Sequence, residues 1–161
     1  MNQHAMRGFR RAMRSLERET GMLLAGETAC CSVTVAQCQL LLEMEARGTS
    51  NLQELADALA LDKSTLSRTV DSLVREGWAE RREDPSNRRK VSLSLTASGQ
   101  EKCNHINAKC DDEYRSLLAR IPADKHALIL EAVGSIAHAM EEARKEKAES
   151  GNGGSPLCCA R

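Results

Sequence analysis

Three of the chain's seven cysteines lie within ten residues, in the stretch ACCSVTVAQC at positions 29–38. Cys30 and Cys31 are adjacent, and Cys38 falls in the first turn of a helix that Thr34 is expected to cap. Unpaired backbone N–H groups and the helix dipole at such a position favour the thiolate, the form that binds soft metals and reacts with oxidants. We therefore expect Cys30, Cys31 and Cys38 to bind a thiophilic ion, such as arsenite, antimonite or another soft metal ion.

The other four cysteines are weaker candidates for the same site. Cys158 and Cys159 form a second adjacent pair in a Gly/Ser-rich tail, where they could complete the site across a dimer or simply be an exposed end. Cys103 and Cys110 lie at helical spacing on an apolar stripe, where cysteines are more often small buried apolar groups. These four residues are therefore possible ligands at most.

A second candidate site lies in the stretch KSTLSRTVDSLVREG at positions 63–77. Leu66, Val70 and Leu73 share one face of the predicted helix and are expected to point inward. The opposite face carries short hydroxyls and cations, namely Lys63, Ser64, Thr65, Ser67, Arg68 and Ser72. Such side chains near a helix N-terminus suit phosphate contacts and base-edge hydrogen bonds in a DNA major groove.

The helical period is followed by two short stretches with a period of two. AERRE at 79–83 and KVSLSL at 90–95 are predicted strands, and DPSNRR at 84–89 is a predicted turn. Arg88, Arg89 and Lys90 would stand at its tip, where a basic side chain can enter a narrow minor groove. Positions 63–90 carry eight basic and five acidic residues in a chain of zero net charge, so the positive charge is local.

The remaining elements are predicted helices that flank this unit. Gly26 is expected to end a first helix, and positions 27–33 to form a connector. The expected organisation is one domain at 1–148, with dimerisation helices at 3–26 and 96–148, a winged helix-turn-helix at about 34–95, and a flexible tail at 149–161. The fold class is mostly α with a small two- or three-stranded β-wing.

Composition narrows the function classes. Aromatic residues make up 2% of the chain, which disfavours single-strand binding by base stacking. The sequence contains no apolar run long enough for a membrane span and no secretory signal, so we expect a cytoplasmic protein with reduced thiols and no membrane partner. It also lacks a C-x-x-C motif and a Gly-rich phosphate loop, and we do not expect an enzyme.

The stretch LQELADALALDKSTLSRTVDSLVREGWAERREDPSNRRKVSLSLTASGQE resembles the MarR family of bacterial regulators. The resemblance implies a homodimer that binds a near-palindromic DNA operator as a repressor. It also implies that Arg89 is the wing arginine for the minor groove and that Ser64, Thr65, Ser67 and Arg68 are groove-reading positions. Asn87 departs from the family, which usually has Asp there, so the carboxylate that braces the wing arginines is absent.

The sequence thus favours a homodimeric DNA-binding repressor with no obligatory cofactor, released from double-stranded DNA by a thiophilic inducer. Three alternatives stay open. Val33 and Cys38 occupy the two positions of a hydrophobic staple, which would make Cys38 a packing residue. The thiols could instead form an oxidant switch on the same repressor. The third alternative is a cytosolic thiol- or metal-handling protein that does not bind DNA.

Overall fold

The computed structural model describes residues 2–84 and 87–150, without the side chains of 27–30, 83–84, 87–90 and 148–149. The chain divides into two compact units, Met1–Asp112 and Glu113–Arg161. No helix in the described part is long and apolar enough to cross a membrane.

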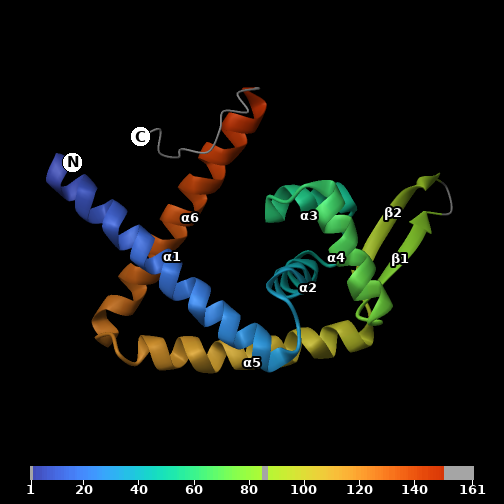
Figure 1. Cartoon of the computed structure of the whole chain (residues 1–161), viewed down its shortest axis with the longest axis horizontal. Helices are drawn as coiled ribbons and strands as arrows, with labels where there is room; N and C mark the ends of the chain where they lie inside the picture. Colours follow the sequence, from blue (N-terminus) through green and yellow to red (C-terminus); the bar gives the residue numbers. More distant parts are fainter. Residues whose placement is uncertain (1, 85–86, 151–161) are drawn as a thin grey trace. The chain divides into compact units, whose positions relative to one another are not determined.

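The first unit holds four helices, a hairpin and most of a fifth helix (Figure 1). Their bounds are α1 Gln3–Cys31, α2 Val35–Arg47, α3 Leu52–Leu59, α4 Lys63–Arg75, β1 Ala79–Asp84, β2 Asn87–Leu95 and α5 Ala97–Leu118. The second unit holds the end of α5, a 3-10 turn at Ala123–Lys125 and α6 His126–Glu149. This element order confirms the predicted fold class.

Short polar side chains fix the starts of α2, α3 and α4, and the expected cap at Thr34 is among them. Thr34 and Gln37 form a reciprocal capping box at α2, and Asn51 and Glu54 form another at α3. Asp62 caps α4 by accepting a hydrogen bond from the Thr65 N–H. These caps satisfy helix N–H groups that would otherwise have no partner, and so they set where each helix begins.

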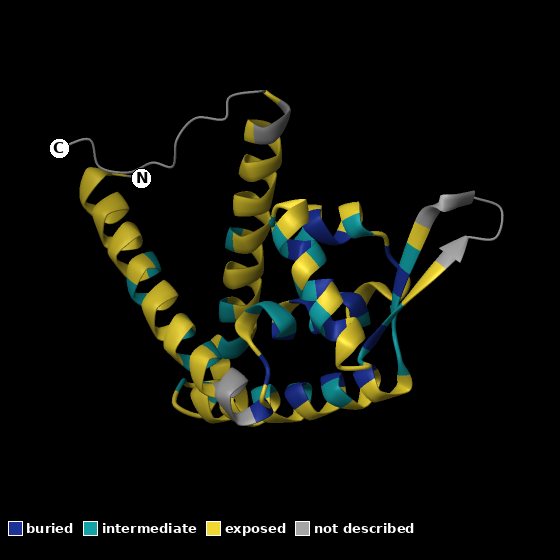
Figure 2. Cartoon of the chain, turned by 45° about the vertical axis from the view of Figure 1, so that its right-hand side comes forward, coloured by how far each residue is buried: buried dark blue, intermediate teal, exposed yellow. Residues whose placement is uncertain are grey.

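A single hydrophobic core joins α2, α3, α4, the base of the hairpin and α5 (Figure 2). Its largest fully buried side chains are Leu40, Leu41, Met44, Leu55, Leu66, Val70, Leu73, Leu93, Cys103 and Ile106. Because Leu66, Val70 and Leu73 come from one face of α4, the core also determines which face of that helix points outward.

The wing is an antiparallel hairpin whose base packs in the core through Ala79 and Leu93. Ala79 pairs with Leu95, and the register shifts between Glu83 and Asp84. Ser50, ahead of α3, forms an isolated bridge with Leu93 beside the two-stranded sheet. The described part thus agrees with a two- or three-stranded wing.

Two predicted boundaries are wrong. Helix α1 continues through Gly26 to Cys31, and the residue with positive φ that ends it is Ser32, at 54°. Gly26 keeps a helical backbone, since glycine permits a helix end without requiring one. Strand β2 begins at Asn87, so Arg88 and Arg89 belong to the strand together with Lys90 and not to the predicted turn.

Candidate nucleic-acid interface

Helix α4 presents a polar face opposite its buried leucines. Lys63, Ser64 and Arg68 are exposed, whereas Thr65 and Ser67 are half-buried. Ser72, near the other end of the helix, is half-buried and accepts a 2.8 Å hydrogen bond from Gln37 Nε2 of α2. The inward-facing side chains are 0% exposed, namely Leu66, Val70 and Leu73. The helix is thus held from behind by the core, and its N-terminal polar residues remain open to a partner.

The N-terminus of α4 is organised by one carboxylate. Asp62 Oδ1 accepts the Ser64 hydroxyl at 2.5 Å and the Thr65 N–H at 2.8 Å. Hydrogen bonds from the side chains of Ser64 and Thr65, and from the Thr65 backbone, hold the pKa of Asp62 well below its usual range. Ser64 and Thr65 therefore take part in capping, which leaves Lys63, Ser67 and Arg68 as the most available predicted groove contacts.

Arg68 lies back along its own helix. Its Nε donates to the Ser64 carbonyl and a terminal nitrogen donates to Thr65 Oγ1, each at 3.3 Å. Both acceptors are neutral and both distances are long, so little energy opposes a change of rotamer toward phosphate or guanine.

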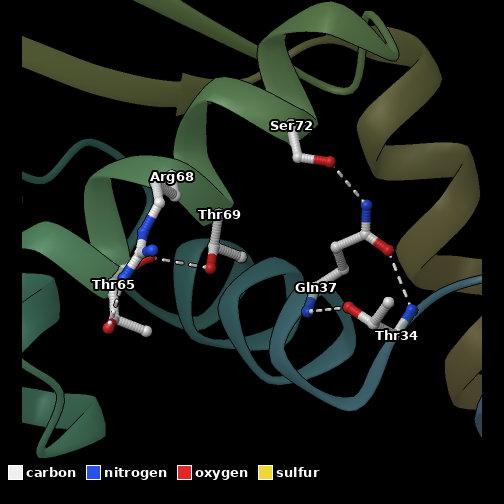
Figure 3. Close-up of a pocket in the computed structure, with 6 residues that line it drawn as sticks. All are labelled: Thr34, Gln37, Thr65, Arg68, Thr69 and Ser72. Carbon is white, nitrogen blue, oxygen red and sulfur yellow. Dashed lines mark hydrogen bonds between the residues drawn. The ribbon is translucent and has the colours of Figure 1, made fainter.

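A pocket of about 310 Å³ opens between α2 and α4 (Figure 3). Its lining residues are all polar, although carbon atoms form most of the surface that they present: Thr34, Gln37, Thr65, Arg68, Thr69 and Ser72. The Gln37–Ser72 hydrogen bond crosses it from one helix to the other. With one guanidinium and four hydroxyls, this pocket suits a small polar molecule with an anionic group.

The wing is tied to α4 by an ion pair. A terminal nitrogen of Arg81 on β1 lies 2.7 Å from Asp71 Oδ1. The pair is partly exposed, and we assign it a role in orientation with a small contribution to stability. The backbone of β2 carries Arg88, Arg89 and Lys90, whose side chains lie outside the description.

The joint between the wing and α5 was not anticipated from the sequence. Thr96 N–H donates to the Trp78 carbonyl at 3.1 Å, and its hydroxyl donates to the Gly77 carbonyl at 2.6 Å. A Cβ on Gly99 would lie 1.9 Å from the Trp78 carbonyl oxygen, so only glycine fits there. A glycine three residues after a helix-capping threonine was the available signal.

A lysine links the end of α1 to the same joint. Lys102 Nζ donates to the Cys31 carbonyl at 2.7 Å and lies 4.8 Å from the centre of the Trp78 ring. A cation at this place satisfies a C-terminal helix carbonyl and interacts favourably with the indole face. The α1 terminus, the wing base and α5 are thereby connected through one side chain.

The cysteines occupy different positions from those expected. Cys31 is in the last turn of α1 and not in a connector, and Cys31 and Cys38 are each only 4% exposed. The Cys38 N–H already donates to the Thr34 carbonyl at 2.9 Å, so the expected unpaired amide is absent at that residue. Val33 is buried with Cys38, which matches the staple alternative.

Cys103 confirms its expected place in the core. Its thiol is 0% exposed and lies 3.5 Å from the Leu41 carbonyl. Burial raises the pKa of Cys103 to about 11, and the nearby Glu45 and Cys38 add to the effect. Cys110 is half-buried beside the same core, whereas the side chains of Cys30, Cys158 and Cys159 lie outside the described residues. In the described part, no group of three or more His, Cys, Asp or Glu residues could hold a metal ion.

Comparison with known proteins agrees with this architecture. The MarR family model matches residues 33–91. The chain is 30% identical over 100 residues to the multiple antibiotic resistance protein MarR of Escherichia coli K12, covering 60% of this chain and 68% of that protein. It is 36% identical over 63 residues to the transcriptional repressor MprA of the same organism, covering 38% of this chain and 36% of MprA.

The solved structures show the same fold. A crystal structure of a mutant E. coli MarR complexed with operator DNA superposes with a TM-score of 0.69 at 23% identity, covering 84% of this chain and 99% of that one. The arrangement of helices and wing is thus shared with a solved structure. On sequence and fold together, the chain belongs to the MarR family.

Proposed function

We propose that the chain is a DNA-binding transcriptional repressor that acts as a homodimer. The observation that carries the proposal is the division of α4 into two faces, one fully buried in the core and one bearing Ser67 and Arg68, with the exposed Lys63 at the helix N-terminus. Support comes from two relatives, since MprA is a transcriptional repressor and an E. coli MarR mutant was crystallised with operator DNA.

In the proposed complex, α4 enters the major groove of the DNA. We call α2, α3, α4 and the β1–β2 hairpin together the reading unit. Arg68 makes a bidentate contact to guanine. Lys63, at the N-terminus of α4, contacts the phosphate backbone of the DNA. Arg89 enters the adjacent minor groove from the wing, and the Asp71–Arg81 pair keeps the wing base aligned with α4. Asp62 stays ionised and caps the helix, so Ser64 and Thr65 contribute mainly to the geometry of its first turn.

The homodimer is proposed from apolar side chains that the single chain leaves uncovered. On α1, Met6, Phe9 and Leu16 are between 42% and 50% exposed. On α6, Leu128 and Met140 are 66% and 61% exposed. Two copies related by a two-fold axis would cover such surfaces and would place two α4 helices in successive major grooves, about 10 base pairs apart.

The experiment uses a duplex that the protein selects from a random pool. Arg68→Ala should reduce the preference for this duplex over random DNA by about 1–3 kcal/mol, because a base contact is lost. Lys109→Ala, which removes an exposed cation from α5, should leave the preference unchanged. Equal preference in the parent and Arg68→Ala would show that α4 does not read the duplex as proposed.

The inducer is a separate part of the proposal. We retain a thiophilic ion, such as arsenite or antimonite, with Cys30, Cys31 and Cys38 as ligands and Cys158 or Cys159 as possible additions. Its support is that Cys31 and Cys38 flank the α1–α2 junction and share the core that positions α4. Because both thiols are buried, binding requires the junction to open, and the ion would act by favouring that open state.

A second candidate inducer is favoured by the pocket in Figure 3. A small organic anion bound there would engage Arg68 and lie against α4, in direct competition with DNA. Thr69→Met should fill this pocket, whereas Ser at Cys30, Cys31 and Cys38 should remove the thiols.

DNA release is then measured under reducing conditions, with arsenite, antimonite and a panel of small organic anions. Loss of arsenite release in the triple Ser variant alone supports the thiol site, and loss of anion release in Thr69→Met alone supports the pocket. Release of the parent by peroxide but not by arsenite would instead favour the oxidant switch.

A further inference from the structure

The first half of α1 carries a row of arginines on one face. They are Arg7, Arg10, Arg11, Arg14 and Arg18, all exposed, and we name them the arginine stripe. At 3.6 residues per turn, their side chains fall within an arc of about 100° and extend about 16 Å along the helix axis. The stripe is thus a straight, narrow surface of positive charge.

This charge is separated from the rest of the molecule. The first 18 residues carry five arginines and one glutamate, while the whole chain has 23 basic and 23 acidic residues. The stripe segment is therefore at +4 and the remainder at −4. Such asymmetry in a neutral chain points to a polyanionic partner for the positive part.

The stripe lacks internal compensation. Arg18 pairs with Glu19 at 3.0 Å, but no described carboxylate pairs with Arg7, Arg10, Arg11 or Arg14. Like charges recur at i, i+4, and the first turn of α1 contains no acidic residue to complement the helix dipole. Such a pattern weakens the helix by itself, and an interaction with an anionic surface would offset that cost.

The apolar face of α1 lies on the other side of the helix from the stripe. Met6, Phe9, Met13 and Leu16 are centred about 135° around the axis from the arginines. A membrane-surface helix also carries cations on its polar face, and it must insert its apolar face to bind. The proposed dimer would cover the apolar face of α1 and leave the stripe outward, so the stripe alone would meet a partner.

We propose that the arginine stripe binds the phosphate backbone of double-stranded DNA independently of sequence. All five cations are arginine, whose planar guanidinium fits phosphate with two hydrogen bonds. No aromatic side chain lies on this face, which disfavours stacking with single-stranded bases. Duplex phosphate is the partner that matches an extended, purely cationic row.

The stripe would not share base pairs with the reading helix. Arg18, its last member, precedes the α1 terminus at Cys31 by 13 residues, or about 20 Å of helix. It is this terminal end that Lys102 ties to the reading unit. The inference rests on the proposed DNA binding and adds a second contact, to a duplex segment away from the bases under α4.

The test replaces Arg7, Arg10 and Arg14 by Gln in the full chain and measures binding to a random-sequence duplex from about 50 to 200 mM salt. Loss of three phosphate contacts should reduce the slope of log affinity against log salt by about 2.7 and weaken binding at low salt by roughly tenfold or more. The matched control replaces the exposed Lys109, Arg120 and Lys125 by Gln, with the same change in net charge and no expected change in slope.

Far-UV circular dichroism should show unchanged helix content, and Arg10→Gln alone should reduce the slope by about 0.9. The inference is overturned if the triple variant keeps the parental slope or if the control loses as much. Phosphatidylglycerol vesicles and polyglutamate serve as competing polyanions, and tighter stripe-dependent binding of either than of duplex also overturns it.

The two proposals fail separately. A chain without operator preference that keeps a stripe-dependent slope refutes the reading function alone. Operator preference with an unchanged slope refutes the stripe alone.

Discussion

Two regions of this chain bury their apolar side chains to very different extents. In the reading unit, Leu40, Leu55 and Leu66 are 0% exposed, whereas Leu128 and Leu130 of α6 are each 66% exposed. The helices of the reading unit cover one another's apolar side chains within a single chain. Helix α6 displays a surface that soluble proteins normally cover, and the difference indicates that a second surface is needed outside the reading unit.

The largest effect should come from adding a charge to the uncovered surface. Val133→Glu is expected to shift the proposed dimer to monomer at micromolar concentration, because it buries a carboxylate at the contact. Light scattering measures this directly. His138→Glu adds a negative charge to the same helix at a side chain that is 72% exposed and about 140° around the helix axis from Val133, and this variant should remain dimeric. A parent that is already monomeric would contradict the comparison.

A second prediction tests the reading unit's tight joint. Gly99→Ala should lower the free energy of unfolding by about 1–3 kcal/mol, because its Cβ would overlap the Trp78 carbonyl. Gly134→Ala in α6 meets nothing within 4 Å and should stabilise by about 0.5–1 kcal/mol through helix propensity. Urea denaturation measures the free energy of unfolding of both variants. Equal changes in the two variants would mean that the space between Gly99 and Trp78 can accommodate a methyl group.

A third prediction concerns pH. The folded pKa of Cys103, about 11, exceeds its ordinary value of 9.0, so the folded state holds this proton more tightly than the unfolded state. Its contribution is fully present below pH 9 and is lost as pH rises toward 11, by about 1 kcal/mol at pH 10. Cys103→Ala should flatten the decline between these pH values. An equally steep decline in that variant would show that another group titrates.

The smallest effect should come from a polar clamp between α2 and α5. Gln100 and Asn107 each donate a side-chain hydrogen bond to one carboxylate oxygen of Glu45, the latter at 2.8 Å. Glu45→Ala should destabilise the unit by about 0.5–1 kcal/mol. Glu43→Ala breaks only an exposed pair with Arg47 on the same helix and should cost less in thermal unfolding. A larger destabilisation by Glu43→Ala than by Glu45→Ala would show that the hydrogen bonds between α2 and α5 contribute little to stability.

The sequence predicted best what local chemistry determines. The cap expected at Thr34 marks the start of α2 because its side chain satisfies the N–H group three residues away. The helical repeat of 3.6 residues correctly placed Leu66 on the buried face of α4 and Arg68 on the exposed face. These inferences needed no knowledge of tertiary contacts.

The failures have a common physical origin in contacts between distant residues. Gly26 could have ended α1, but the Lys102 ammonium, 71 residues beyond Cys31, binds the carbonyl at the later end. Cys38 was predicted to be a reactive thiol, but in the structure it is buried in the core near Cys103. Burial and long-range hydrogen bonds decide such cases, and the local pattern does not contain them.

The central claim is that two copies of the α4–wing unit read one duplex. Selection of bound sequences from a random duplex pool by the full chain tests it most directly. The chain should enrich a near-palindrome whose half-sites are centred about 10 base pairs apart, and Arg68→Ala should lose this enrichment. A parent that enriches no sequence, or only an isolated half-site, would contradict it.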